Sequence, residues 1–358
     1  MTAPTATPLR RRLAEAARML TTPLLPEDYL ALVNPLWSTA DPRGRVETVQ
    51  HEVAGVATLV IRPGITWPGH LPGQWLKIGV DLDGVRHWRT FSLSSPPRPD
   101  GRITITVKAT EDGRVSQHLV NTIHPGAIVR LAAAEGEFVL PSPLPGRLLF
   151  LTAGSGITPV MAMLRDLAAR RAMPDTVLIH SARTPDEVIF GAELRDLARR
   201  FPNLRLHERH TAADGRFTLD ELGDVCADWT DRDAWACGPT ALLDDAEEHW
   251  HANGAAARLR VEHFRPRLLA AEGEGGRVTF ATSGVEVDAD GGTPLLDAGE
   301  RAGALLPSGC RMGICYSCVG RLRTGQVRDL RTGEVHGEEG HLVQTCVSAA
   351  AGPVEIEL

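Results

Sequence analysis

The stretch Cys310-Arg311-Met312-Gly313-Ile314-Cys315-Tyr316-Ser317-Cys318, followed at a distance by Cys346, is the most informative part of this chain. Three thiolates on one tight loop and a fourth from a remote segment meet the geometry of two irons bridged by two sulfides. Gly309 and Gly313 allow the loop to curl so that amide N–H groups point at the sulfurs. The sequence therefore predicts a [2Fe–2S] cluster held by Cys310, Cys315, Cys318 and Cys346. Structural zinc is the alternative, but such sites usually pair two C-x2-C knuckles and this segment contains one.

Length and composition set the frame around this cluster. The chain has 358 residues, enough for two or three domains of about 150 residues. Hydrophobic residues make up 43% and charged residues 23%, which excludes disorder as the main state. The formal charge of 38 − 45 = −7 excludes a nucleic-acid binder held by phosphate contacts. The sequence has no run of about 18 apolar residues and no signal peptide after its N-terminal arginines, so we expect a cytoplasmic protein.

The C-terminal segment 277–358 resembles plant-type [2Fe–2S] ferredoxin domains along its whole length, through residues 293–300 and 308–315. This resemblance implies a β-grasp fold and a one-electron carrier with a potential of about −400 mV. Apolar residues that alternate over 278–287 predict a β-hairpin at its start. The Gly-rich segment 265–276 is expected to be a flexible linker.

The preceding chain divides into three further parts. Residues 1–42 are expected to form a leader, with a helix over 11–20 and with Tyr29 and Trp37 as anchors. Residues 43–142 carry short β-type runs separated by turn signals, which predict an antiparallel β-barrel or sandwich. These runs are 56–62, 74–80, 90–93, 103–109 and 128–132. Residues 143–264 alternate strands at 148–152, 176–180, 204–207, 234–237 and 259–263 with helices at 159–171, 192–200 and 239–253. This alternation predicts a doubly wound parallel sheet.

A flavin site is indicated by Arg89-Thr90-Phe91-Ser92 in the barrel region. A flavin needs a cation for its phosphate, a flat partner for its ring and a hydrogen-bond donor near N5, and these side chains could supply all three. Taken alone the motif is weak, because arginine and phenylalanine in a strand more often belong to surface and core. Gly113-Arg114-Val115-Ser116 then begins a predicted helix, whose N-terminus suits a pyrophosphate.

A nucleotide site is indicated by two turns. Gly154-Ser155-Gly156-Ile157-Thr158-Pro159 follows an apolar strand and opens a helix, where nucleotides bind in such sheets. Cys237-Gly238-Pro239 ends a later strand at the same carboxyl edge. Ser181 and Arg183 follow the second strand of the sheet, where a hydroxyl and a cation suit a 2′-phosphate and favour NADPH over NADH. The alternative is that Arg183 is an ordinary solvated arginine.

Together these motifs resemble the ferredoxin–NADP reductase superfamily across residues 43–264. The resemblance implies that residues of the first two motifs bind a flavin, namely Arg89, Thr90, Phe91, Ser92, Gly113, Val115 and Ser116, and it favours FAD over FMN. Phe91 replaces the commoner tyrosine. The nicotinamide nucleotide is assigned to Gly154, Gly156, Thr158, Pro159, Cys237, Gly238 and Pro239. Ser92 and Cys237 are the candidate catalytic residues. Glu262 and Phe264 either line the flavin or are an ordinary strand end and a buried anchor.

The implied cofactors form one circuit. A nicotinamide delivers two electrons as hydride and a [2Fe–2S] centre accepts one at a time, so a flavin must stand between them. Residues 29–37 and 180–190 resemble actinobacterial reductases that serve acyl-CoA desaturases, which implies such a partner and is compatible with peripheral contact to a membrane-bound acceptor. The alternatives are a reductase for an oxygenase or cytochrome P450, or a non-catalytic iron–sulfur redox sensor.

Overall fold

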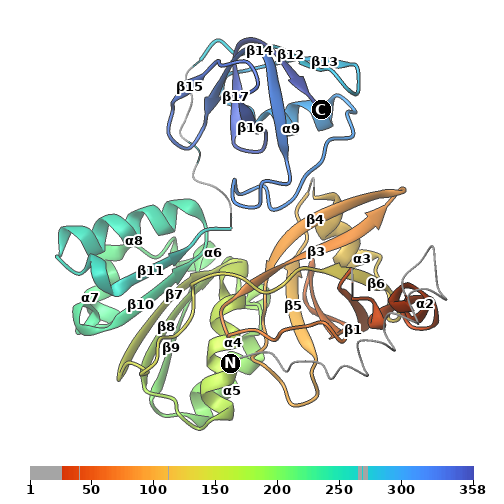
Figure 1. Cartoon of the computed structure of the whole chain (residues 1–358). Helices are drawn as coiled ribbons and strands as arrows, with labels where there is room; N and C mark the ends of the chain where they lie inside the picture. Colours follow the sequence, from red (N-terminus) through yellow and green to blue (C-terminus); the bar gives the residue numbers. More distant parts are fainter. Residues whose placement is uncertain (1–25, 40, 112, 265–267, 269–272) are drawn as a thin grey trace, which may run out of the picture.

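The fold is built from three β-sheets that follow one another along the chain (Figure 1). The computed structural model describes residues 26–39, 41–111, 113–264, 268 and 273–358. The helix expected over 11–20 lies outside the described residues. No helix within these ranges has both the length and the apolar character needed to cross a membrane.

The first sheet is an antiparallel barrel with strand order β4-β3-β6-β1-β2-β5. Its strands are β1 (Arg43–Val53), β2 (Val56–Pro63), β3 (Trp75–Leu82), β4 (Val85–Ser92), β5 (Ile103–Lys108) and β6 (Ile128–Leu131). An isolated bridge from Leu93 to Ile105 joins the end of β4 to β5 and closes the barrel. Helix α3 (Arg114–Asn121) packs on the barrel through buried Val115 and Leu119. The predicted antiparallel barrel is confirmed.

The sequence did not predict β1, and the structure shows why. The strand is mostly polar and has few buried side chains. Among its apolar residues, Val46 is the one that is fully buried. The strand is fixed by pairing with β2 along its length instead. Before it lie α2 (Pro26–Val33) and the 3-10 turn η1 (Pro35–Trp37). The expectation that Tyr29 and Trp37 anchor this arm is wrong: they are 43% and 40% exposed, and Leu36 between them is the buried residue.

The second sheet is parallel, with strand order β11-β10-β7-β8-β9. Its strands are β7 (Arg147–Ala153), β8 (Asp175–Ala182), β9 (Leu204–His210), β10 (Asp233–Cys237) and β11 (Leu259–Glu262). Its helices are α4 (Ile157–Ala169), α5 (Gly191–Arg200), α6 (Thr211–Asp214), α7 (Leu222–Val225) and α8 (Thr240–Ala252). Neighbouring residues of β7 enter different cores, Phe150 with α4 and α5 and Leu151 with α8. Both faces are therefore covered, which confirms the doubly wound sheet.

The third sheet has the order β13-β12-β17-β14-β15, and β16 pairs with β14. Its elements are β12 (Gly276–Phe280), β13 (Val285–Ala289), α9 (Leu295–Arg301), β14 (Val319–Asp329), β15 (Val335–His336), β16 (Leu342–Gln344) and β17 (Ser348–Glu357). The predicted hairpin is present, and β12 runs parallel to β17, as a β-grasp fold requires. The loop between α9 and β14 extends toward the other two sheets (Figure 1).

Candidate functional site

The cysteine loop connects α9 to β14, and Cys346 joins it from the turn between β16 and β17. The Cys310 amide donates to Cys315 Sγ at 3.2 Å and the Met312 amide to Cys310 Sγ at 3.3 Å, so amides do point at the sulfurs. Gly309 is required here, because a Cβ at this position would lie 2.5 Å from Cys315 Sγ. Gly313 has a φ of +71°, which few other residues adopt.

The four thiols lie in two interacting pairs. Cys310 interacts with Cys315, and Cys346 with Cys318. The hydrogen bond from Cys346 lowers the pKa of Cys318 to about 6, which favours the thiolate that metals bind. The described residues contain no compact group of three or more side chains that could hold a single metal ion. Four sulfur donors with inward amides fit a [2Fe–2S] cluster.

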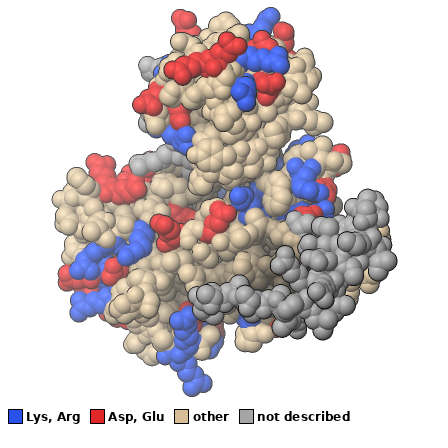
Figure 2. Space-filling model, in the orientation of Figure 1, with Lys and Arg blue, Asp and Glu red and all other residues tan. Residues whose placement is uncertain are grey.

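The surface of this loop is apolar. Leu305, Ile314 and Tyr316 are 74%, 55% and 69% exposed. In the space-filling view, both positive and negative side chains are also present where the third domain meets the other two (Figure 2). Arg311 lies within the loop and pairs with Asp297 and Glu300.

The flavin motif occupies the end of β4, beside β3. Arg89 is largely buried, and burial, with a smaller contribution from the charge of Arg311, lowers its pKa to about 10. Its side chain donates to the Trp88 carbonyl at 2.8 Å and forms no ion pair with a described residue. A desolvated cation without a carboxylate partner is the environment that a phosphate would complete.

Two hydroxyls of the same strand also lack partners. The Oγ1 of Thr90 and the Oγ of Ser92 are buried and have no hydrogen-bond partner among the described residues. Buried polar atoms are rarely left unpaired without a ligand or water. Phe91 is half-buried and packs against the barrel core. The chemistry of β4 therefore fits a polar, planar ligand.

The predicted helix after Gly113 is confirmed as α3. Gly113, Val115 and Ser116 play different parts at its start. A Cβ on Gly113 would lie 2.0 Å from Thr110 Oγ1, so the turn admits glycine alone without rearrangement. The Ser116 hydroxyl is already engaged: it accepts from the Thr110 amide at 3.1 Å and donates to the Gly113 carbonyl at 3.0 Å. The Val115 side chain enters the barrel core. A pyrophosphate here would therefore meet mainly backbone N–H groups of the first turn.

The glycine turn after β7 is the 3-10 turn η2 (Gly154–Gly156), and it leads into α4. A Cβ on Gly156 would lie 2.0 Å from the Cys237 carbonyl oxygen, so this turn packs directly on the end of β10. A Cβ on Gly238 would lie 3.3 Å from Ala153, which is also a close approach. The two turns that the sequence assigned to one edge of the sheet are thus in contact. Thr158 donates to the Ser155 carbonyl and is buried, as is Pro159.

Cys237 and Glu262 are direct neighbours across β10 and β11. Burial raises the pKa of Glu262 to about 8, and its Oε2 has no partner among the described residues. Burial, with a smaller contribution from Glu262, raises the pKa of the Cys237 thiol. Cys237 is therefore a neutral thiol beside a carboxyl that keeps its proton at neutral pH. Phe264, beyond the strand end, is 39% exposed.

The two residues assigned to the 2′-phosphate differ in exposure. Ser181 is nearly buried at the end of β8. The Arg183 side chain is 76% exposed, and its Nε donates to Glu187 Oε1 at 3.0 Å. To bind this guanidinium, a 2′-phosphate would have to replace Glu187 as its ion-pair partner.

Sequence reasoning missed His180, which directly precedes Ser181. It is fully buried, its Nδ1 lies 2.8 Å from Thr152 Oγ1, and its Nε2 has no described partner. Burial lowers its pKa to about 4. A histidine inside an apolar strand at the binding edge was the signal that could have singled it out.

Comparisons with known proteins agree with this arrangement. Residues 64–140 match the model of an oxidoreductase FAD-binding domain, 150–248 that of an oxidoreductase NAD-binding domain, and 278–351 that of a 2Fe-2S iron-sulfur cluster binding domain. The chain is 51% identical, over 97% of its length and 92% of the relative, to the "NADPH oxidoreductase" of Mycobacterium tuberculosis. It is 33% identical, over 81% of its length and 84% of the relative, to the ferredoxin reductase component of 3-ketosteroid-9-alpha-monooxygenase from Mycolicibacterium smegmatis. The solved structure of phthalate dioxygenase reductase shares the fold, with a TM-score of 0.62, 22% identity and coverage of 88% of this chain and 97% of that one.

Proposed function

The chain belongs to the ferredoxin reductase superfamily, as a member with a [2Fe–2S] ferredoxin domain, and from this premise we propose that it takes electrons from NADPH and delivers them to a fatty acyl-CoA desaturase. It is an NAD(P)H oxidoreductase in which electrons pass from NAD(P)H through FAD to the cluster. The choice of NADPH rests first on the 51% identity, over nearly the whole chain, to a protein named for that nucleotide.

Each cofactor is assigned to the residues described above. When bound, FAD would supply an acceptor for the hydride of the reduced nicotinamide that can release the two electrons one at a time. The residues that hold it are Arg89, Thr90, Phe91 and Ser92 on β4 and the backbone of Gly113, Val115 and Ser116. The cluster ligands are Cys310, Cys315, Cys318 and Cys346.

The nicotinamide nucleotide is assigned to the paired turns at the edge of the second sheet. Its contacts are Gly154, Gly156, Thr158, Pro159, Ser181, Arg183, Cys237, Gly238 and Pro239. Ser92 supplies the donor beside the hydride acceptor, and Cys237 bounds the nicotinamide from the opposite domain. Glu262 holds a proton beside that thiol, and we assign the partly exposed Phe264 to the outer edge of the site.

The desaturase assignment rests on the similarity of residues 29–37 and 180–190 to reductases of that kind. An oxygenase is the second candidate, because several relatives are named as reductase subunits of monooxygenases or demethylases. Anaerobically purified protein is mixed in air-saturated buffer, because both acceptors consume O2, with NADPH and either a membrane desaturase with acyl-CoA or a Rieske-type oxygenase with its substrate. We expect unsaturated product and steady NADPH consumption with the first acceptor. If product forms only with the oxygenase, the partner is an oxygenase and not a desaturase. A protein that keeps its cluster but does not turn over NADPH would be a redox sensor.

A further inference from the structure

A partly buried arginine links the nucleotide domain to the flavin-binding strand. Arg165 lies on α4, and its Nη1 donates to the main-chain carbonyl of Ser94 at 2.6 Å. Ser94 stands two residues beyond Ser92, at the point where the chain leaves β4. The bond therefore connects the helix that begins at the glycine turn to the strand that carries the flavin motif.

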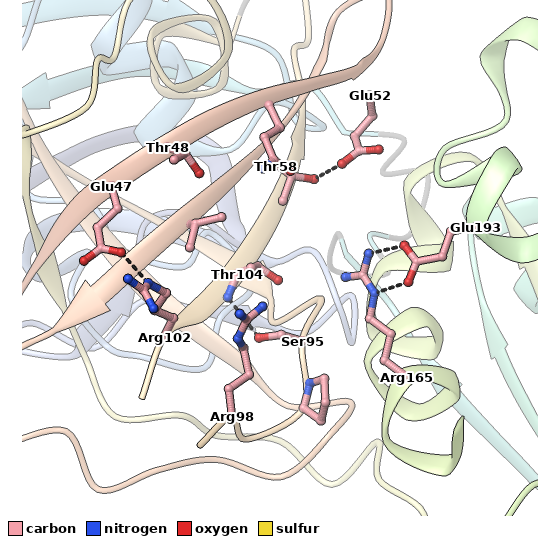
Figure 3. A pocket seen from close by; sticks show the side chains of 13 residues that line it. Glu47, Thr48, Glu52, Thr58, Ser95, Arg98, Arg102, Thr104, Arg165 and Glu193 are labelled. Atoms are coloured by element: carbon pink, nitrogen blue, oxygen red, sulfur yellow. Dashed lines mark hydrogen bonds and ion pairs between the residues drawn. The ribbon is translucent and has the colours of Figure 1, made fainter. Parts of the chain in front are cut away.

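The nucleotide-domain side of this link is held firmly. Glu193 on α5 accepts from Arg165 Nε at 2.9 Å and from Nη2 at 2.5 Å, a bidentate pair. The Arg165 Cζ also lies 4.8 Å from the centre of the Phe190 ring. Figure 3 shows the two charged side chains pointing at one another across from the barrel strands. Because the carboxylate neutralises the guanidinium and orients it, the remaining donor is directed at Ser94.

The barrel side is equally fixed. The Ser94 amide donates to the Thr104 carbonyl at 2.8 Å, and its hydroxyl lies 2.9 Å from Thr104 Oγ1 and 3.0 Å from Thr106 Oγ1. The Ser94 side chain is fully buried. The acceptor carbonyl therefore cannot move without disturbing β5.

Beside this link the two domains are separated by a cavity. It has a volume of about 660 Å³ and is lined from the barrel by Ser95 and Thr104 and from the helices by Arg165 and Glu193 (Figure 3). Elsewhere Met163 of α4 packs beside Gly73, where an added Cβ would lie 2.5 Å from the Met163 Cε. The hydrogen bond from Arg165 to Ser94 thus joins α4 to the barrel beside this open space, and apolar packing that includes Val56 of β2 joins them elsewhere.

From this geometry we infer that Arg165 is a positioning residue for hydride transfer: it fixes the angle at which the nucleotide turn presents the nicotinamide to the flavin. Misplacement of reacting atoms by about 1 Å can slow a reaction by about 100-fold. The inference rests on the reductase activity, and it concerns the rate of flavin reduction, not the identity of the final acceptor.

The test compares the full-length holoprotein with Arg165→Ala, Arg165→Lys and the control Arg170→Ala. Arg170 lies at the end of the same helix and forms an exposed ion pair with Asp166. Flavin reduction by saturating NADPH is followed in an anaerobic stopped-flow instrument, together with the long-wavelength absorption of nicotinamide stacked on flavin. We expect reduction about 10- to 100-fold slower in Arg165→Ala, with a weaker stacking band and with FAD and iron content unchanged. Arg165→Lys should recover part of the rate, because an ammonium can reach Ser94 or Glu193 but cannot chelate as a guanidinium does. Arg170→Ala should match the wild type.

A reduction rate and stacking band in Arg165→Ala equal to those of the wild type would overturn the inference. If that variant loses FAD, Glu193→Ala decides the question, because it leaves Arg165 in place but frees the guanidinium to turn away from Ser94. We then expect slower reduction in the same direction, and an unchanged rate overturns the inference. Failure of the wild type itself to be reduced by NADPH would instead refute the proposed function.

Discussion

At the scale of single residues, the site combines groups that are buried without partners and groups that are exposed with partners. Thr90 and Ser92 are in the first class, and Arg89 beside them is a largely buried cation that forms no ion pair with a described residue. Arg183 is in the second class, since it is solvated and paired with Glu187. If the proposed assignments hold, the flavin would meet buried groups and the 2′-phosphate would meet an exposed one.

Nucleotide choice can be tested at Arg183. A hydrogen bond from arginine to a 2′-phosphate contributes roughly 1.5–3 kcal/mol, whereas the exposed pair with Glu187 that it replaces contributes less than about 1 kcal/mol. Arg183→Ala should raise the KM for NADPH by about 10- to 150-fold and leave the KM for NADH unchanged. The kcat should hardly move, because the contact is equal in ground and transition states. Ser181→Ala should act in the same direction but less. An equal rise in the KM for NADPH and for NADH would contradict the prediction, and Arg183 would then be an ordinary surface residue.

The protonation of Glu262 gives a stability prediction. The folded protein keeps this proton up to about pH 8, whereas an unfolded glutamate releases it near 4.5. Between these values the folded state binds more protons, so the free energy of unfolding falls as pH rises, by up to about 1.4 kcal/mol per pH unit. Glu262→Gln removes this dependence, and its melting temperature should exceed that of the wild type by a margin that grows from pH 5 to pH 8. Glu248→Gln, on the exposed face of α8, controls for the lost charge, and a margin independent of pH would contradict the prediction.

At the scale of elements, the turns at the edge of the second sheet set the geometry of the site. Strands with strong apolar patterns, such as β7 and β8, could be predicted from the sequence, and so could the glycine turn between β7 and α4. The polar strand β1 could not, because its position depends on pairing with β2 and not on its own pattern. Nor could Arg165, since an arginine on a helix gives no sign that its partner is a carbonyl 71 residues away.

The contact between the turns can be tested with Gly156→Ala. The added Cβ would meet the Cys237 carbonyl oxygen at 2.0 Å, so the turn must move away from β10. Overpacking of this kind costs about 1–3 kcal/mol. We expect a lower midpoint of thermal unfolding and a higher KM for NADPH. Gly146→Ala is the matched control, because a Cβ there meets nothing within 4 Å. Identical behaviour of the two variants would show that the turns tolerate separation.

At the scale of the whole molecule, the order of carriers can be tested with Cys318→Ser. This change should remove the cluster and leave FAD bound, since the thiols belong to the third sheet and the flavin motif to the first. NADPH-to-ferricyanide activity should survive, because reduced flavin can reduce ferricyanide directly. Transfer to the protein acceptor should collapse. Loss of both activities with FAD still present would show that the carriers do not act in a line.

The parallel pairing of β12 with β17 has a consequence for biosynthesis. Val278 of β12 pairs with Val354 of β17. The first strand of the third sheet therefore cannot form this pairing until the last strand has been synthesised. Domains generally fold in the order in which the ribosome releases them. The two sheets that precede it can therefore mature, and take up their nucleotides, while the iron–sulfur domain is still an open chain. Cluster assembly is then the last step of maturation. A shortage of iron can therefore lower electron transfer to the acceptor protein without lowering the flavin content.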